Sequence, residues 1–259
     1  MRIPIRMIDI ATTFFWIFLI AFFVSAVYSV KDVHFDFGEP QIGVSADNEI
    51  LFSLPVLIAN RGFYDIGAFR VFTEISDSES FVIASGSTFV PVINRDNEVT
   101  VIHNMTVDVN DFLQRDQNYL FNDTELKIYA AVGMRIAEMI PVEASTNLSM
   151  PWGAPLYNFA LGEAQYSAYN NTHLRATVPI SFENHAFFDV AGNIQVRMYN
   201  NSNRRLGGGE TSIVAPPNSP YNGYLEFYVS MARLTESGHF EVYFLTSFFN
   251  YGPLVIPYG

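Results

Sequence analysis

Histidine is the side chain that most often binds a metal ion or transfers a proton near neutral pH. This sequence has five, and no two stand at the spacing of the H-x-x-x-H or H-E-x-x-H metal motifs: His34, His103, His173, His185 and His239. Because cysteine is absent, thiolate zinc sites, iron–sulfur clusters, cysteine nucleophiles and disulfides are excluded. We expect no catalytic, cofactor-binding or metal-ligating residue and no enzymatic activity. The alternative, an enzymatic or metal-binding domain, requires histidines and carboxylates to converge through folding alone.

One acidic segment offers oxygen ligands. It runs from Asp108 to Glu125 and also contains Asp111, Asp116 and Asp123. Carboxylates of this kind bind calcium, but the spacing fails the EF-hand pattern and lacks its glycine. A calcium site and a solvated acidic loop therefore both remain open. The segment from Asp111 to Leu120 is the one plausible helical turn, inside about ten residues after Val107 that the first half of the chain has and the second half lacks.

N-glycosylation sequons are the clearest modification signal. Five Asn-x-Ser/Thr triplets occur, all after residue 100, and they make N-linked glycans a possible partner chemistry: Asn104, Asn122, Asn147, Asn170 and Asn200. Asn170 and Asn200 lie in predicted turns and are the strongest candidates. Asn104 lies in a predicted strand and needs an outward-facing side chain. Unmodified polar turn residues are the alternative.

An uncharged apolar stretch occupies residues 10–30 and determines where these sites are displayed. At 1.5 Å per helical residue it spans about 30 Å, one hydrocarbon core, so we expect a transmembrane helix in contact with the lipid bilayer. Arg2 and Arg6 precede it, which by the positive-inside rule places a short tail of residues 1–9 in the cytoplasm. Everything from residue 31 onward is then extracellular or pseudo-periplasmic. The alternative is a signal peptide cleaved after Ala26, although signal h-regions are usually shorter.

Charge narrows the partners further. The chain carries 14 Lys and Arg against 26 Asp and Glu, a formal charge of −12, which disfavours nucleic acid and anionic lipid headgroups. Aromatic residues make up 15%, a level typical of β-rich cores or membrane contact.

An internal repeat organises the remainder. Residues 38–66 recur as residues 162–190 without a gap, with identical residues at about a quarter of the positions against roughly 6% by chance. The matching pairs include Asn60 with Asn184 and Asp65 with Asp189. Because both aspartates follow an aromatic pair at equivalent turns, we interpret them as turn caps rather than catalytic carboxylates. His103 aligns with Phe227 and is therefore expected to be structural.

Within each copy the apolar residues alternate with a period of two, which predicts strands buried on one face. About seven short strands per copy, separated by turn residues, indicate antiparallel β-sandwiches. The Gly207–Gly209 run after two arginines is interpreted as a hairpin turn. The predicted fold is all-β: two tandem antiparallel β-sandwich domains, residues 31–150 and 157–259, joined by a linker at 151–156 and following one transmembrane α-helix.

The repeat resembles the LEA type 2 (WHy-like) family of β-sandwiches. The resemblance rests on an alternating strand that ends in Asn, seen as residues 56–60 and 180–184, followed by an apolar continuation and a small-residue turn. Arg61 and His185 stand where the family usually has proline. The resemblance implies an immunoglobulin- or fibronectin-like fold, no catalytic residues and an archaeal cell surface as the setting.

These observations predict a non-enzymatic, single-pass membrane protein. We expect it to act as a structural or accessory subunit, an adaptor or spacer, with other membrane or cell-envelope proteins as partners. A pilin-like surface filament subunit is the alternative, because archaeal pilins also join a hydrophobic helix to a β-sandwich.

Overall fold

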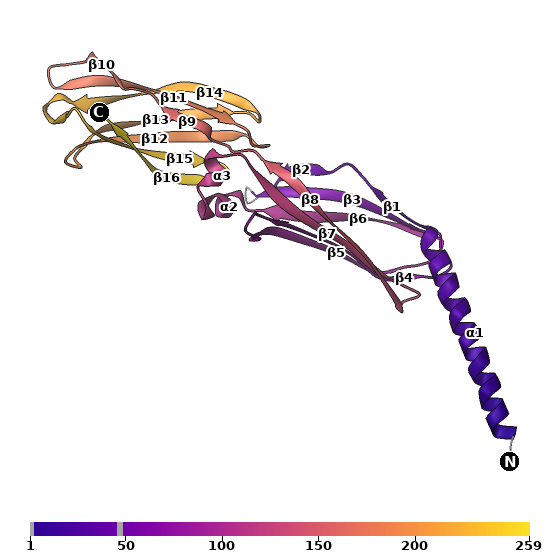
Figure 1. Cartoon of the computed structure of the whole chain (residues 1–259). Coiled ribbons are helices and arrows are strands. Elements are labelled where there is room, and N and C mark those ends of the chain that lie inside the picture. Colours follow the sequence, from indigo (N-terminus) through magenta and orange to yellow (C-terminus); the bar gives the residue numbers. More distant parts are fainter. Residues whose placement is uncertain (1–2, 46–48) are drawn as a thin grey trace. The chain divides into compact units, whose positions relative to one another are not determined.

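The computed structural model describes the backbone of residues 3–45 and 49–259, and side chains within these ranges from residue 12 onward. Met1, Arg2 and the side chains of Arg6 and Asp9 lie outside the described residues, as do residues 46–48 of a predicted turn. The chain is 62% strand and 14% helix. One apolar helix, α1 (Ile3–Lys31), precedes two sets of antiparallel strands (Figure 1). The predicted all-β fold is therefore confirmed.

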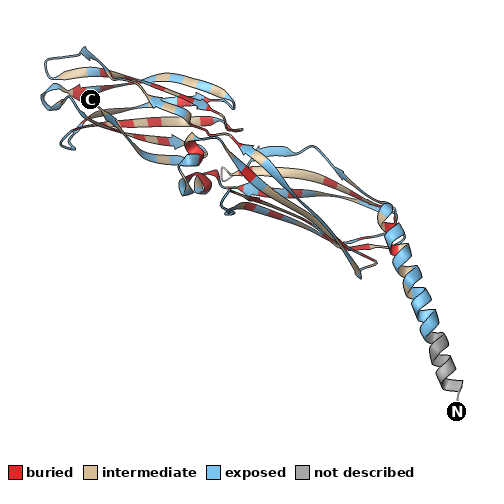
Figure 2. Cartoon of the chain, in the orientation of Figure 1, coloured by how far each residue is buried: buried red, intermediate tan, exposed pale blue. Residues whose placement is uncertain are grey.

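The first eight strands form two four-stranded sheets. In one sheet β3 pairs with β1 and β2 and with β6; in the other the order is β5-β4-β7-β8. Buried positions alternate with more exposed ones along strands such as β4 and β6, whereas β2 is exposed throughout (Figure 2). The buried set includes Val56, Ile58 and Phe69. The strands are β1 (Val33–Phe37), β2 (Gln41–Val44), β3 (Ile50–Asn60), β4 (Ile66–Ser76), β5 (Val82–Ile93), β6 (Asn97–Val107), β7 (Thr124–Ile136) and β8 (Ile140–Trp152).

The last eight strands repeat this topology strand for strand. Here β11 pairs with β9 and β10 and with β14, and the second sheet has the order β13-β12-β15-β16. The repeat found in the sequence is therefore a repeat of the whole sandwich, with eight strands per copy where the sequence predicted about seven. The strands are β9 (Tyr157–Leu161), β10 (Gln165–Ala168), β11 (His173–Asn184), β12 (Val190–Asn200), β13 (Arg205–Ala215), β14 (Ser219–Ser230), β15 (Gly238–Thr246) and β16 (Asn250–Tyr258); a 3-10 turn, Met231–Arg233, follows β14.

A buried asparagine at the end of one strand explains why the repeat preserves it. Asn60, at the end of β3, is fully buried; its Nδ2 donates to the carbonyl oxygens of Tyr64 (3.0 Å) and Ile93 (3.1 Å). Its Oδ1 accepts from the backbone N–H of Gly62 at 3.1 Å. One side chain therefore satisfies backbone groups from two loops where main-chain pairing stops, and buried polar groups of this kind need such partners.

Asn184 makes the same set of bonds at the end of β11. Its Nδ2 donates to the carbonyl oxygens of Phe188 (2.8 Å), Ala215 (2.9 Å) and Pro216 (3.1 Å), and its Oδ1 accepts from Ala186 N–H at 3.0 Å. The asparagine is thus a structural element of each sandwich.

The chain divides into two compact units whose boundaries differ from the expected ones. The first unit comprises residues 1–43, 51–106 and 127–148, and the second comprises residues 44–50, 107–126 and 149–259. The segment 107–126, which carries α2 (Val109–Arg115) and α3 (Asn118–Phe121), therefore belongs with the second sandwich.

Packing within the second unit accounts for this assignment. Trp152 Nε1 donates to the carbonyl oxygen of Tyr119 at 2.9 Å, and Leu156 N–H donates to the carbonyl oxygen of Leu120 at 2.9 Å. Trp152, Ala154 and Leu156 are buried. The segment 151–156, expected as a linker, is therefore part of the core of the second unit.

The glycine run of residues 207–209 is also placed differently from the prediction. It lies inside β13, and the turn occupies residues 201–204. A Cβ on Gly207 would collide with the carbonyl oxygen of Tyr228, and one on Gly209 would lie 2.9 Å from that of Glu226. These glycines permit the close approach of β13 to the backbone of β14, so the hairpin interpretation was wrong.

Candidate functional site: the apolar helix and its docking loop

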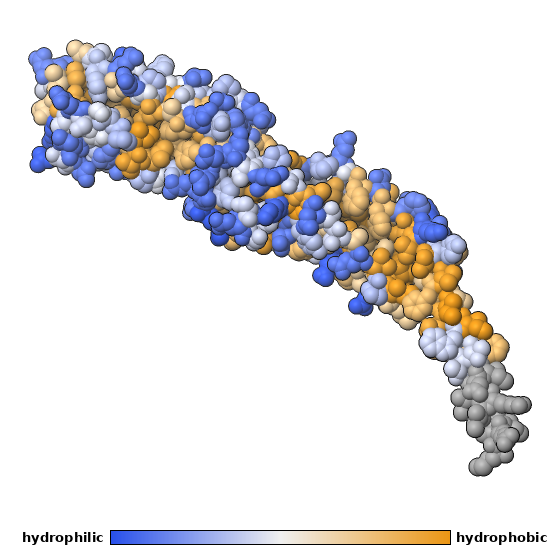
Figure 3. Space-filling view, in the orientation of Figure 1, coloured by the Kyte–Doolittle hydropathy of each residue, from blue (hydrophilic) through white to orange (hydrophobic). Residues whose placement is uncertain are grey.

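The described part of α1 is apolar on all sides. Residues 12–31 are long and apolar enough to cross a bilayer, and Phe14 and Phe18 are each 70% exposed. Figure 3 shows hydrophobic side chains on the visible face of the described part of this helix. Large apolar side chains also project at Phe15, Trp16 and Ile17. A soluble core helix would bury one face, so this helix has the surface expected of a membrane span or signal sequence.

The last turns of α1 are built into the first sandwich. Ala26 is 3% exposed and belongs to the core cluster of Val56, Ile58 and Phe69. Ser29 is also buried, and its hydroxyl accepts hydrogen bonds from Phe63 N–H at 2.8 Å and, more weakly, from Tyr64 N–H at 3.4 Å. Small residues at these helix positions let the backbone of the sandwich approach closely.

The loop that receives the helix follows the buried Asn60 and spans residues 61–65; we call it the docking loop. The Tyr64 ring packs edge-on against Phe22, with centroids 5.6 Å apart, and its hydroxyl hydrogen-bonds Ser25 at 2.7 Å. Any side chain at Gly62 would collide with the Ser29 hydroxyl. The contacts of the docking loop with α1 thus extend over about two helical turns, from Phe22 to Ser29.

Asp65 ties the docking loop to two neighbouring hairpins. Its Oδ1 accepts from Arg95 N–H at 2.7 Å, and its backbone carbonyl accepts from Ala137 N–H at 3.0 Å. The expected capping role is therefore found for Asp65, although its partner lies in another hairpin. Asp189, the equivalent residue in the second copy, makes no such side-chain bond within the described residues.

Four of the five predicted glycosylation asparagines are accessible. Asn104, Asn122, Asn147 and Asn170 are exposed, and Asn104 faces outward from β6 as its strand position requires.

Asn200 has a structural role instead. It is 6% exposed, its Nδ2 donates to the carbonyl oxygen of Arg233 at 3.1 Å, and its Oδ1 accepts from Ser202 and Arg204 N–H groups. A glycan on this nitrogen would have to displace the hydrogen bond to Arg233 from a buried side chain, which argues against Asn200 as an acceptor. Asp77 organises the corresponding turn of the first sandwich through the same pair of N–H contacts, to Glu79 and Phe81.

The aspartates of the acidic segment also have structural tasks. Asp108 caps α2 by accepting from Asp111 N–H at 3.0 Å, and Asp116 accepts from Asn118 N–H at 2.9 Å. Among the described residues no group of three or more His, Asp or Glu has the arrangement of a metal site.

His103 and His185 stand in opposite environments. His103 is buried between the hydroxyls of Thr88 (2.9 Å) and Thr73 (3.1 Å), and burial lowers its pKa. A neutral imidazole with one donor and one acceptor nitrogen fits between two hydroxyls. The structural role expected for His103 matches this geometry.

His185 lies between two carboxylates. Its Nδ1 contacts Asp123 Oδ2 at 2.7 Å, its Nε2 contacts Glu183 Oε2 at 3.2 Å, and its ring stacks on Tyr157 with centroids 4.3 Å apart. The hydrogen bond to Asp123 raises the pKa of His185, with Glu183 adding to the effect. Asp123 also accepts from Ala154 N–H at 2.8 Å, so this cluster fastens the segment 107–126 to the second sandwich. Sequence reasoning missed it because 62 residues separate its two main members.

Comparison with known proteins leaves the family open. No protein-family profile matches the chain, and no curated protein is detectably related to it. The resemblance to LEA type 2 proteins therefore stays a prediction.

Weak likeness to solved structures is found. A structural-genomics target aligns at 12% identity and a TM-score of 0.30 over 54% of this chain and 97% of its own. Red sea bream transglutaminase aligns at 14% and 0.30 over 88% and 31%, and the secreted serine protease VesC of Vibrio cholerae at 8% and 0.25 over 80% and 47%. This chain therefore spans less than half the length of those two enzymes. The fold and the helix define the class: an all-β protein with two tandem sandwiches behind one N-terminal apolar helix.

Proposed function

We propose that this protein is a non-enzymatic, single-pass membrane protein that displays two β-sandwiches outside the cell as a structural or accessory subunit, an adaptor or spacer. The observation that carries the proposal is the docking of α1. The same helix presents exposed apolar side chains from Phe14 to Phe18 and buries Ala26 and Ser29 in the first sandwich. Anchor and displayed domain are thus a single folded piece.

The length of α1 supports a retained anchor. Residues 12–31 of α1 cover about 30 Å at 1.5 Å per residue, one hydrocarbon core, and the charged Arg6 and Asp9 lie before them. Cleavage after Ala26 would remove a buried core residue together with the Phe22 and Ser25 contacts to Tyr64. A signal peptide has no reason to make such contacts, because it is absent from the folded product.

Orientation follows from charge. Arg2 and Arg6 precede the span, while Lys31 is followed by a strongly acidic chain, so the positive-inside rule puts the N-terminus in the cytoplasm. The four exposed sequons then face the side on which N-glycosylation occurs. Partners are other membrane or envelope subunits, which can pack on the Phe-rich helix or pair with edge strands such as β5, β8 and β13.

Substituted-cysteine labelling tests the topology without background, because the chain has no cysteine. Ser237→Cys is on an exposed turn of the second sandwich, and Ile5→Cys lies before the span. In intact cells a membrane-impermeant maleimide should label Ser237→Cys alone, and both variants after permeabilisation. If Ile5→Cys alone is labelled in intact cells, the N-terminus is outside the cell and the proposed topology is wrong.

Two further readouts address anchoring and partnership. The intact mass should show a chain that retains residues 1–26, and the protein should stay in the pellet after alkaline carbonate extraction. A mature chain that begins after Ala26 would refute the anchor. Mild detergent extraction followed by mass spectrometry should recover membrane or envelope proteins in fixed ratio, and recovery of the chain alone would refute the subunit role.

A further inference from the structure

The outer face of the sheet β5-β4-β7-β8 carries a trough of about 640 Å³ that contains two arginines. Arg70 on β4 and Arg135 on β7 are exposed and form no ion pair with any described residue. Acidic residues outnumber basic ones in this chain by 26 to 14, yet this hollow is lined by two arginines and one carboxylate, Glu143. An anion that enters the hollow is attracted by both guanidinium groups.

The floor of the trough is open because of its small residues. The register places Gly133 beside Arg70 and Ala131 beside Phe72, and Ala68 completes the floor at a bulge in β4. A Cβ built on Gly133 meets no heavy atom within 4 Å, so space lies directly above the sheet there. Ala68 has a φ of 49°, a conformation that costs a non-glycine residue energy and that clusters at binding sites.

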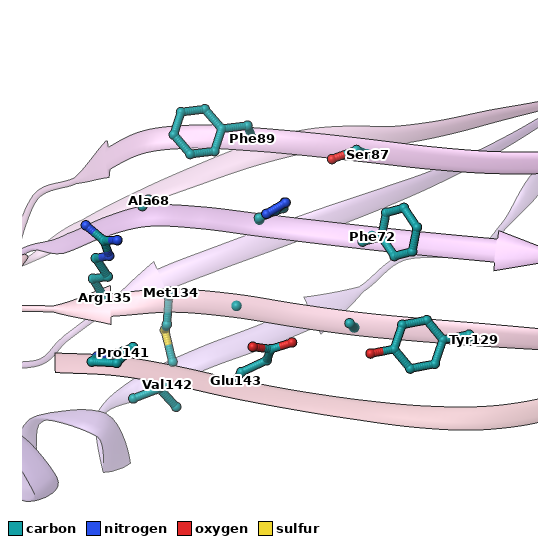
Figure 4. A pocket seen from close by; sticks show the side chains of 13 residues that line it. Ala68, Phe72, Ser87, Phe89, Tyr129, Met134, Arg135, Pro141, Val142 and Glu143 are labelled. Carbon is teal, nitrogen blue, oxygen red and sulfur yellow. The ribbon is translucent and has the colours of Figure 1, made fainter.

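The two ends of the trough differ in their lining, and Phe89 and Pro141 lie toward the end that holds Arg135 (Figure 4). Phe72 and Tyr129 lie together at one end, with centroids 6.3 Å apart, while Arg135 lies at the other end and Glu143 between them (Figure 4). Aromatic faces stack on the apolar face of a sugar ring, guanidinium groups bind carboxylates through paired hydrogen bonds, and a free carboxylate accepts from hydroxyls.

The position on the sheet argues against an extended peptide as the occupant. Both β4 and β7 are paired on either side, so their main-chain groups are already used and a peptide strand gains no backbone bonds there. Recognition must come from side chains alone, which suits a compact ring that bears a carboxylate and hydroxyls.

The geometry points to a binding site for a uronic-acid-type sugar, with Arg70 and Arg135 on its carboxylate, Glu143 on its hydroxyls and Phe72 and Tyr129 against its ring. The site is independent of the membrane anchor, so it stands or falls separately from the proposed function. Its natural ligand is an acidic polysaccharide or glycan.

Titration calorimetry on the full chain in detergent micelles tests the site, with oligogalacturonate as the probe. A neutral maltooligosaccharide and hexaglutamate are the comparison ligands. We expect oligogalacturonate to bind, and Arg70→Gln/Arg135→Gln to weaken it by about tenfold or more, since hydrogen bonds to charged groups are lost. The matched charge control is Arg204→Gln/Arg205→Gln, which alters two exposed arginines of the second sandwich and should leave binding unchanged.

A second pair of variants tests the site without changing its charge. Gly133→Tyr fills the open space above the sheet and should abolish binding, while Gly43→Tyr, whose Cβ also meets nothing within 4 Å, should not. Thermal melts followed by circular dichroism confirm that each variant folds. The proposal is overturned if oligogalacturonate fails to bind at millimolar concentration, if hexaglutamate or the neutral sugar binds as tightly, or if the arginine and Gly133 variants bind normally.

Discussion

Removing the asparagine at the end of β11 should destabilise the second sandwich strongly. Asn184→Ala leaves the carbonyl oxygens of Phe188 and Ala215 and the N–H of Ala186 without partners in a buried site; the Pro216 carbonyl is less buried and counts for less. Each orphaned buried group costs about 1–3 kcal/mol, and relaxation or water entry recovers part of that. We therefore expect a loss of about 3 kcal/mol in the free energy of unfolding.

Fluorescence of Trp152 gives a local readout of this change. Trp152 is buried in the second unit beside Phe188, and Trp16→Phe removes the only other tryptophan. Denaturant unfolding in micelles should shift to a lower midpoint in Asn184→Ala with an unchanged slope. Asn222→Ala, an exposed asparagine on β14, is the matched control and should change stability by less than about 0.5 kcal/mol.

The reasoning is refuted if the two variants unfold at the same denaturant concentration. Asn184→Asp provides a second check, because it keeps the acceptor for Ala186 N–H but replaces the donor nitrogen with an oxygen that faces three carbonyl groups. It should be at least as destabilising as alanine, and a stable aspartate variant would contradict the bonding described.

Three further predictions follow from named contacts. Gly62→Ala should loosen the docking of α1 and speed proteolysis near residue 31, since its Cβ collides with the Ser29 hydroxyl, whereas Gly43→Ala should have no effect. The contacts of His185 with Asp123 and Glu183 raise its pKa in the folded state. Their contribution to the free energy of unfolding is therefore complete below the unfolded pKa near 6.5 and is lost as pH rises through the folded value. His185→Gln should remove this part of the pH dependence when unfolding is measured as a function of pH. Asn147→Gln should remove glycan mass without loss of stability. Asn200→Gln should lower the melting temperature without loss of a glycan, and a glycan found on Asn200 would contradict the hydrogen bond from its side chain to Arg233.

The strands could be predicted because each depends on the alternation of apolar and polar residues within one short segment of the sequence. Alternating residues such as those of β3 and β14 report a buried and an exposed face, and a repeat that keeps Asn60 and Asn184 marks equivalent strand ends. The alternation does not show which residue each side chain contacts in the folded chain. Asn200 has the sequence of a glycosylation site, and only its contact with Arg233 shows that it is engaged within the fold.

Long-range packing accounts for the remaining differences. The glycines at 207–209 were interpreted as a turn because glycine is common in turns, but a close approach of two strands requires the same residue type. The trough on the outer sheet has no motif either: Arg70 and Arg135 are 65 positions apart by number, and only the pairing of β4 with β7 brings them into the lining of one hollow.

The two copies use the same loop to hold the segment that precedes them. In the first sandwich Arg61 N–H donates to the carbonyl oxygen of Asp32 at the end of α1, and Tyr64 packs on Phe22. In the second, the equivalent His185 N–H donates to the carbonyl oxygen of Ala154, and the equivalent Phe188 packs on Trp152. The docking loop is therefore a property of the repeated fold rather than an adaptation of one copy to a membrane helix.

This equivalence explains the segment 107–126 better than a calcium loop does. The docking loop of the first sandwich packs on α1, which supplies apolar side chains to the contact. The equivalent loop of the second sandwich, residues 185–189, receives only the short segment from Trp152 to Leu156. Residues of the segment 107–126 complete it: Tyr119 and Leu120 bond to residues 152–156, and Asp123 contacts both Ala154 and His185. A carboxylate at Asp123 suits this place, because its two oxygens accept from the Ala154 N–H and contact the His185 ring together.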